Sequence, residues 1–301
     1  MKRRPQIGWL ADGRRLHLQD GPIDLIVEAM GDPEDVRDAY RAAADRFAGL
    51  LDRLCGELAL LRSPVSSHSP LPHERVARRM HAAVAPFAPS TFITPMAAVA
   101  GSVADEILSA MLACDLDKAY VNNGGDIALH IGDGESFTIG LIDRPDRPGL
   151  FGTTRLTAGE GVRGVATSGW RGRSFSLGIA DAVTVLAATA AQADAAATVV
   201  ANAVDLPGHP GIRREPASSL QPDSDLGERP VTRDVAPLSR RDLERALSRG
   251  KGCAENLVRS GLIRGAALHL QGETEVVGIA TPATMPSLRA SSRPSQSTVH
   301  A

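Results

Sequence analysis

The sequence has few residues of several kinds, and each scarcity narrows the classes of protein to which it can belong. Lysine occurs only at Lys2, Lys118 and Lys251 among 301 residues, so arginine supplies nearly all of the positive charge. Aromatic residues make up 3% of the chain, and the formal net charge is -2. So few aromatic side chains make base stacking an improbable mode of binding. A slightly negative net charge gives no electrostatic attraction to nucleic acids or anionic lipids. We expect neither nucleic acid nor a membrane as a partner.

Cysteines and long apolar runs are also scarce. The three cysteines, Cys55, Cys114 and Cys253, are far apart, so they imply neither a Cys-x-x-Cys zinc site nor a disulfide framework. The apolar segment Met96–Cys114 is interrupted by two acidic residues and is a poor membrane span. The first residues, MKRRPQIGWLADG, lack the apolar run of a secretory signal, so we expect a cytoplasmic protein.

The remaining composition, with 43% apolar and 23% charged residues, is typical of a globular protein with a substantial core. Strand and helix patterns interleave, and several strand candidates meet at tight turns such as Asp12-Gly13. Long helices are predicted over Pro33–Leu61 and Ser239–Ser260. The sequence therefore predicts an α+β fold with a largely antiparallel sheet flanked by helices.

We expect a single domain over residues 1–280. It is divided into an N-terminal β unit and long helix (1–90), a motif-bearing core (91–205) and a C-terminal excursion, helix and hairpin (206–280). Residues 281–301 are low in apolar side chains and are predicted to be disordered. The Pro- and Ser-rich stretch 207–237 is long enough for a surface excursion, and whether it acts as a lid is left open.

The first candidate site is a carboxylate and a hydroxyl on an Ala-rich helix predicted over Ala191–Val204. Asp194 and Thr198 are four residues apart, so on a helix they lie on the same face. Carboxylate and hydroxyl oxygens are hard ligands that suit Mg²⁺ when water and phosphate complete its shell. In the alternative interpretation, Asp194 caps this helix and Thr198 bonds back to a backbone carbonyl.

The second candidate site is the run Asn122-Asn123-Gly124-Gly125-Asp126 between two predicted strands. Two glycines permit positive φ and leave backbone N–H groups open to an anion. An ordinary hairpin turn explains the glycines equally well. The ligand-binding interpretation involves Asn122, Gly124, Gly125 and Asp126.

Three features, taken in chain order, resemble the ApbE family of FAD-dependent flavin transferases. They are a small-residue helix start that ends in Gly101 with Asp105 four residues on, the Asn122–Asp126 run, and Thr167-Ser168-Gly169 followed by the ADAxAT box at 193–198. The resemblance covers about Thr94–Val204. It is stronger to a compact branch of ApbE-like proteins that forms an uncharacterised protein family.

The resemblance implies Mg²⁺ bound by Asp194, Thr198 and the carbonyl of Ala97, and FAD or FMN bound in a pocket lined by Asn122–Asp126 and Thr167-Ser168-Gly169. It implies an enzyme that acts on FAD or a related nucleotide, by FMN transfer or by pyrophosphate cleavage. The alternative is a protein that binds a flavin, a nucleotide or another small ligand and has lost flavin transfer. Whether the chain is an enzyme and whether it forms a homo-oligomer are left open.

Two departures from the family pattern support that alternative. Ala100-Gly101 stands where the family usually has Lys-Gly, and the family's His-x-x-Asp-Pro segment is missing before the ADAxAT box. Arg171 and Arg173 are candidates for phosphate binding, since arginine holds phosphate bidentately. Asp181 is a candidate base or further metal ligand, and a buried, hydrogen-bonded structural carboxylate is the alternative.

Overall fold

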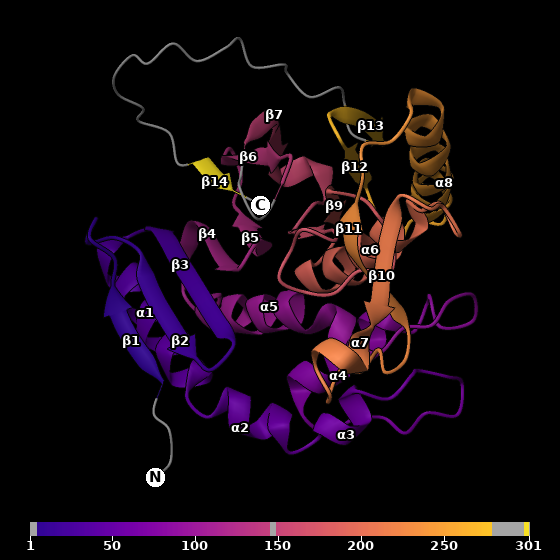
Figure 1. Cartoon of the computed structure of the whole chain (residues 1–301). Helices are drawn as coiled ribbons and strands as arrows, with labels where there is room; N and C mark the ends of the chain where they lie inside the picture. The colour runs from indigo at the N-terminus through magenta and orange to yellow at the C-terminus, as the bar shows by residue number, and fades with distance from the viewer. Residues whose placement is uncertain (1–4, 145–148, 279–297, 301) are drawn as a thin grey trace. The chain divides into compact units, whose positions relative to one another are not determined.

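A computed structural model describes residues 5–144, 149–278 and 298–300 of the chain (Figure 1). The chain divides into two compact units. The first contains the chain up to Ser136 together with residues 157–166 and 187–195. The second contains residues 137–156 and 167–186 and the chain from Ala196 onward. The single domain over residues 1–280 stays a prediction.

The strands of the first unit pair in the order β1-β2-β3-β4-β5-β8, and the neighbours are antiparallel. Leu16 and Leu18 of β2 are buried and alternate with more exposed residues, as in a strand with one covered face. The hairpin predicted at Asp12-Gly13 is confirmed between β1 and β2. The strand bounds are β1 Gln6–Trp9, β2 Leu16–Asp20, β3 Ile23–Gly31, β4 Leu116–Asn123, β5 Asp126–Ile131 and β8 Gly164–Ser168.

The helical part of the first unit differs from the prediction of one long helix over Pro33–Leu61. That prediction is wrong, because the segment is broken after Phe47 and again near Gly56. Gly49 adopts a positive φ of 67°, which turns the backbone out of the first helix at little cost for a glycine. The bounds are α1 Pro33–Phe47, α2 Leu50–Cys55, α3 Leu58–Leu61, α4 Arg75–Val84, α5 Val99–Met111, and the 3₁₀ helices η1 Pro95–Ala98 and η2 Ala158–Glu160.

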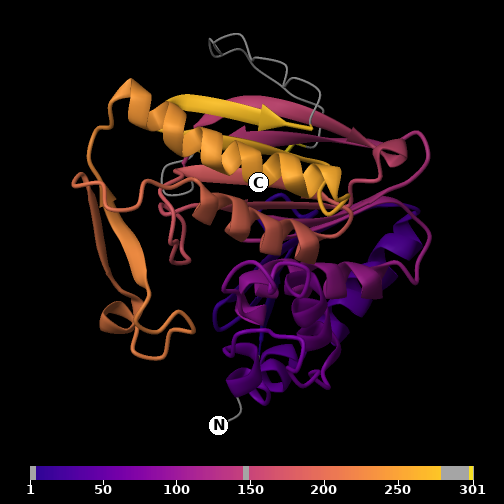
Figure 2. The same cartoon turned by 90° about the vertical axis from the view of Figure 1, so that its right-hand side faces the viewer.

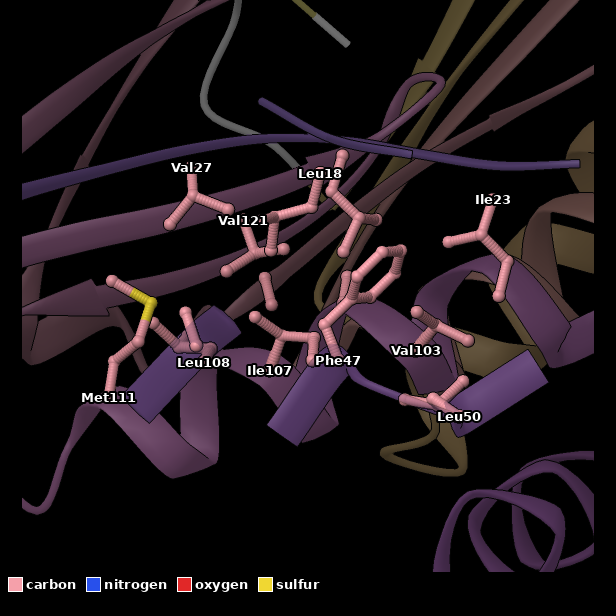
Figure 3. Close-up of a cluster of buried hydrophobic side chains, with 14 of the residues drawn as sticks. Leu18, Ile23, Val27, Phe47, Leu50, Val103, Ile107, Leu108, Met111 and Val121 are labelled. Carbon is pink, nitrogen blue, oxygen red and sulfur yellow. The ribbon is translucent and has the colours of Figure 1, made fainter. Parts of the chain in front are cut away.

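The core of the first unit forms where its strands meet α1 and α5 (Figure 3). Leu18 and Val121 extend from the strands towards Phe47 of α1 and Ile107 of α5, and all four are fully buried. Burying one such side chain contributes roughly 1.5–3 kcal/mol. This packing fixes α5, whose first turn carries part of the candidate site.

The strands of the second unit form three groups. The strands β9-β12-β13 are antiparallel neighbours, β10 and β11 form an antiparallel hairpin, and β14 pairs parallel with β6 in a group that also contains β7. Residues 279–297 and 301, most of the segment predicted to be disordered, lie outside the described residues. The bounds are β6 Ser136–Ile142, β7 Leu150–Thr157, β9 Ala182–Ala187, β10 Ile212–Pro216, β11 Pro230–Val235, β12 Gly265–Leu270, β13 Glu273–Val277 and β14 Thr298–His300.

Helix α8 (Arg240–Arg259) begins where the sequence predicts it. Ser239 is its N-cap and accepts a hydrogen bond from the N–H of Asp242 at 3.2 Å. The helix packs along β12 and β13 of the same unit (Figure 2). The stretch 207–237 forms the β10–β11 hairpin and the short helix α7 (Ala217–Leu220). Helix α6 (Ala190–Ala203) begins in the first unit and continues into the second.

The predicted α+β class, with helices and a largely antiparallel sheet, is confirmed. Over the described ranges, no helix combines the length and the apolar character that a membrane crossing requires.

Candidate functional site

The Asn122–Asp126 run forms the turn of the β4–β5 hairpin in the first unit. Asn123 pairs with Asp126, so Gly124 and Gly125 are the two loop residues, with φ values of 66° and 111°. A two-residue hairpin loop of this kind requires positive φ at its centre, which glycine adopts without strain. Asn122 Oδ1 closes the turn by accepting the N–H of Gly125 at 2.8 Å. The hairpin accounts for the glycines, and ligand contact at this run stays a prediction.

The hairpin is linked to the start of α5 by one buried side chain. Asn123 donates from Nδ2 to the carbonyl of Ala100 at 3.1 Å. The next residue, Gly101, lies so close to α6 that an added Cβ would be 2.2 Å from the carbonyl oxygen of Ala190. Only a glycine permits this approach, and it brings the first turns of α5 and α6 together.

Each of these two helices is capped by a carboxylate of the other. Asp194 of α6 accepts the N–H of Gly101 at 3.0 Å, near the start of α5. Asp105 of α5 accepts the N–H groups of Ala190 and Ala191, at 3.0 and 2.9 Å, at the start of α6. Carboxylates in these positions satisfy otherwise unpaired amides and interact favourably with the helix dipole. Asp194 therefore caps α5, whereas the alternative interpretation had it cap its own helix.

The Asp194 carboxyl lies in an unfavourable electrostatic environment. Burial, followed by the charge of nearby Asp126, raises its pKa well above the ordinary value, although the N–H groups of Gly101 and Ala100 oppose this shift. Burial also raises the pKa of the Asp105 carboxyl. A cation bound beside Asp194 and Asp126 would offset both the burial and the repulsion of their negative charges.

The donor set of this cluster suits Mg²⁺ only if other oxygens contribute. Among the residues that the structure describes, no group of three or more His, Cys, Asp or Glu side chains is arranged to hold a metal. Mg²⁺ commonly binds through one or two carboxylates and completes its shell with water and substrate phosphate. Asp194 and Asp126 fit that pattern. The Ala97 carbonyl, in η1 just before α5, and the Thr198 hydroxyl, one turn beyond Asp194 on α6, stay predicted ligands.

The Thr167-Ser168-Gly169 motif lies in the second unit, at the end of β8 and just after it. The hydroxyl of Thr167 bonds that of Thr184 on β9 at 2.8 Å, and Ser168 is half-buried. An added Cβ on Gly169 would lie 2.5 Å from the carbonyl oxygen of Asp181. The glycine is therefore explained by packing within the unit, and ligand contact at the motif stays a prediction.

Asp181 has the contacts of a buried, hydrogen-bonded structural carboxylate, the alternative to a base or metal ligand. It is buried, and its Oδ1 accepts hydrogen bonds from Arg171 Nε at 2.6 Å and Trp170 Nε1 at 3.2 Å. Its Oδ2 accepts the N–H of Gln271 at 2.6 Å. The Arg171 guanidinium also stacks on the Trp170 ring at 4.2 Å, whereas Arg173 is exposed. A base or metal ligand at Asp181 would have to give up some of these bonds, and that role stays a prediction.

Sequence reasoning assigned no role to Asp105 or Asn123. For Asp105 a signal existed, because a carboxylate inside an otherwise apolar helix needs a partner. For Asn123 none existed, since nothing in the sequence distinguishes the residue that reaches Ala100 from its neighbour Asn122.

The chain is an α+β protein of the ApbE-like class. More particularly, the family model AbpE_bact, described as AbpE bacteria, matches residues 7–276, and the chain belongs to that family. The resemblance inferred from the motifs is therefore confirmed.

Three curated relatives illustrate the similarity. A UPF0280 protein of Methanopyrus kandleri is 41% identical over 128 residues, which cover 42% of this chain and 48% of the relative. A UPF0280 protein of Methanosphaerula palustris is 38% identical over 130 residues, covering 40% of this chain and 48% of the relative. A UPF0280 protein of Methanococcus maripaludis is 35% identical over 158 residues, which cover 50% of this chain and 62% of the relative. The chain spans about half the length of the curated relatives it matches.

Two solved structures are similar at lower levels. The apo form of the flavinyl transferase ApbE of Pseudomonas stutzeri has a TM-score of 0.44 and 14% identity, over 92% of this chain and 95% of that one. The flavin transferase ApbE of Vibrio cholerae has a TM-score of 0.33 and 16% identity, over 83% of this chain and 76% of that one.

Proposed function

We propose that the chain binds Mg²⁺ at Asp194 and Asp126 and uses it to bind FAD or a related nucleotide through its pyrophosphate. The observation that carries this proposal is the placement of two neighbouring carboxylates beside the first turn of α5 in the first unit. Burial of Asp194 and the charge of Asp126 disfavour the ionised Asp194 carboxyl, and a bound cation would offset both effects.

The local structure supports a metal and a phosphate at the same place. The hydrogen bond from Gly101 holds one oxygen of Asp194, which orients the carboxylate before any ligand arrives. The start of α5 carries the partial positive charge that favours phosphate. When bound, Mg²⁺ would neutralise the pyrophosphate and polarise its phosphorus. The choice of a flavin or a similar nucleotide rests on membership of the ApbE-like family.

A second candidate function, binding without transfer, is favoured by one specific observation. Asp181, the candidate base, already accepts three hydrogen bonds and pairs with Arg171. No lysine stands beside Gly101, where the family usually has one. These features favour a protein that holds a nucleotide without performing the transferase reaction.

Both candidates are tested by incubating the purified chain with FAD, with and without Mg²⁺. Binding is measured by calorimetry, products by chromatography for FMN and AMP, and FMN transfer by intact mass. Asp194→Asn and Asp126→Asn should each weaken Mg²⁺-dependent FAD binding by at least about tenfold, because each removes a charged ligand. Asp133→Asn, an exposed residue of the same unit, is the matched control and should bind as the wild type does.

The outcomes separate the hypotheses. Mg²⁺-dependent release of AMP that both variants lose indicates an enzyme, and saturable binding with no product after hours indicates a binding protein. Undiminished binding in both variants would contradict the metal site. Absence of FAD binding by the wild type would contradict the choice of a flavin nucleotide. Asp126 caps no helix start described above, so its variant remains informative if Asp194→Asn is unstable.

A further inference from the structure

A groove in the second unit lies outside every motif used above. It has a volume of about 820 Å³ and runs between α8 and the loop 206–209. Sites for small molecules typically have volumes of about 300–1,000 Å³. The groove is therefore large enough for a ligand of the size of a nucleotide.

One wall of the groove is a row of arginines. Arg241, Arg245 and Arg249 are four residues apart on α8, so they follow one side of the helix with a rise of about 6 Å per step. The helix backbone is held against the core of its own unit, since an added Cβ on Gly250 would lie 2.2 Å from Cγ2 of Val204. The row is thus presented by a fixed helix.

Acidic side chains form an ion pair with one of the three arginines of this row. Arg245 pairs with Asp242 at 3.2 Å, and Glu244, which also lines the groove, pairs with Arg240 at 3.1 Å. Within the described ranges, neither of the other two arginines of the row forms an ion pair. Like charges four residues apart repel each other on a helix. An anion in the groove would offset that repulsion.

The opposite wall supplies an oriented imidazole, that of His209. The N–H of Gly211 donates to Nδ1 of His209 at 3.1 Å, so the ring carries its hydrogen on Nε2. This Nε2 lies 3.6 Å from Oδ2 of Asp242. The imidazole is therefore held in one orientation at the edge of the arginine row, and Ser248 adds a hydroxyl to the same lining.

From this groove we infer a second binding site, one for the oligophosphate group of a small ligand. Guanidinium groups bind phosphate through two parallel N–H···O bonds. A row of three at intervals of about 6 Å suits several linked phosphoryl groups better than a single phosphate. In the described part of the chain no Phe, Tyr or Trp side chain lines the groove, so the large aromatic platforms on which bases commonly stack are missing there. The site binds the phosphates and does not select a base.

The test is calorimetric titration of the whole chain with inorganic triphosphate in EDTA, where Mg²⁺-dependent binding at Asp194 does not contribute. We expect saturable binding that weakens as the salt concentration rises. The double variant Arg241→Gln/Arg249→Gln should bind triphosphate about tenfold more weakly or worse, since charge-assisted contacts to phosphate are lost. Arg259→Gln makes the same change on the same helix outside the groove and should bind as the wild type does.

Several results would overturn this inference. They are no saturable binding by the wild type, unchanged affinity in a folded double variant, and equal affinity for inorganic phosphate and triphosphate. Tighter binding of a single-stranded oligonucleotide would identify a nucleic-acid surface instead. Asp126→Asn should bind triphosphate normally in EDTA, so failure of the groove and failure of the proposed Mg²⁺ site are distinguishable.

Discussion

At the scale of single residues, the carboxylates of Glu106 and Asp194 have opposite electrostatic environments. Glu106 is buried on α5, next to Asp105, and accepts hydrogen bonds from Arg46 Nε and Arg79 Nη1, both at 2.8 Å. Burial alone would raise its pKa, but the hydrogen bond from Arg46 and the charge of Arg79 hold the pKa below the ordinary value. The ionised form of Glu106 is thus stabilised by pairing, whereas that of Asp194 is not.

We expect Glu106→Gln to destabilise the protein by about 1.5–3 kcal/mol, since it removes the buried charge that accepts hydrogen bonds from the half-buried Arg46 and Arg79. Glu244→Gln breaks an exposed pair with Arg240 and should cost about 0–1 kcal/mol. Urea unfolding of both variants measures the difference. Equal losses for the two would show that the Glu106 pairs contribute no more than a surface ion pair.

The destabilisation caused by Glu106→Gln should depend on pH. Because the pKa of Glu106 is lowered in the folded state, its contribution is present above the unfolded pKa of about 4.3 and is lost as pH falls through the folded value. The gap in unfolding free energy between the wild type and Glu106→Gln should therefore narrow below about pH 4. A gap that stays constant down to pH 3 would contradict the lowered pKa.

At the scale of secondary-structure elements, the close crossing of α5 and α6 in the first unit determines where Asp194 lies. Gly101 and Ala190 are in contact through backbone atoms, so neither side can yield by changing a rotamer. The capping hydrogen bonds of Asp105 and Asp194 require the same approach. The spacing of these helices, as much as the side chains, therefore builds the candidate metal site.

We expect Gly101→Ala to destabilise the protein by about 1–3 kcal/mol, since the added methyl group overpacks a backbone contact. Gly252→Ala on α8 is the matched control, because an added Cβ there meets nothing within 4 Å. It should stabilise the protein by roughly 0.5–1 kcal/mol through helix propensity. Thermal unfolding of both measures the contrast, and a stabilised Gly101→Ala would contradict the close crossing.

At the scale of the whole molecule, the two compact units are not separate stretches of chain. The chain passes between them five times, after residues 136, 156, 166, 186 and 195. All five passages fall inside an element, in β6, β7, β8, β9 and α6. Unfolding one unit alone would therefore break a helix and four strands in mid-course.

We expect a single cooperative transition in differential scanning calorimetry, with equal calorimetric and van't Hoff enthalpies. The physical reason is the shared helix and strands, because a half-formed helix loses hydrogen bonds without gaining the entropy of a free chain. Two resolved transitions would contradict this expectation. They would also contradict the single domain predicted from the sequence.

Local patterns predicted those parts of the fold that depend on neighbouring residues. The hairpin at Asp12-Gly13, the start of α8 at Ser239 and the turn at Gly124-Gly125 each follow from the residues at that place. The prediction of one helix over Pro33–Leu61 failed because propensity and apolar spacing continue across Gly49, while packing favours a break there. Glycine lowers the cost of the break but does not require it.

The sequence by itself determined the α+β class, the ApbE-like membership and the order of the motifs, because these depend on local periodicity, turn residues and short residue patterns. Only the tertiary structure decided that Asp194 caps α5, that Asp105 caps α6, and that Asp181 is held by Arg171 and Gln271. It also showed the arginine row of α8 facing a groove. Those partners lie far away along the chain, and burial and charge act through space, so no window of neighbouring residues contains the information that pairs them.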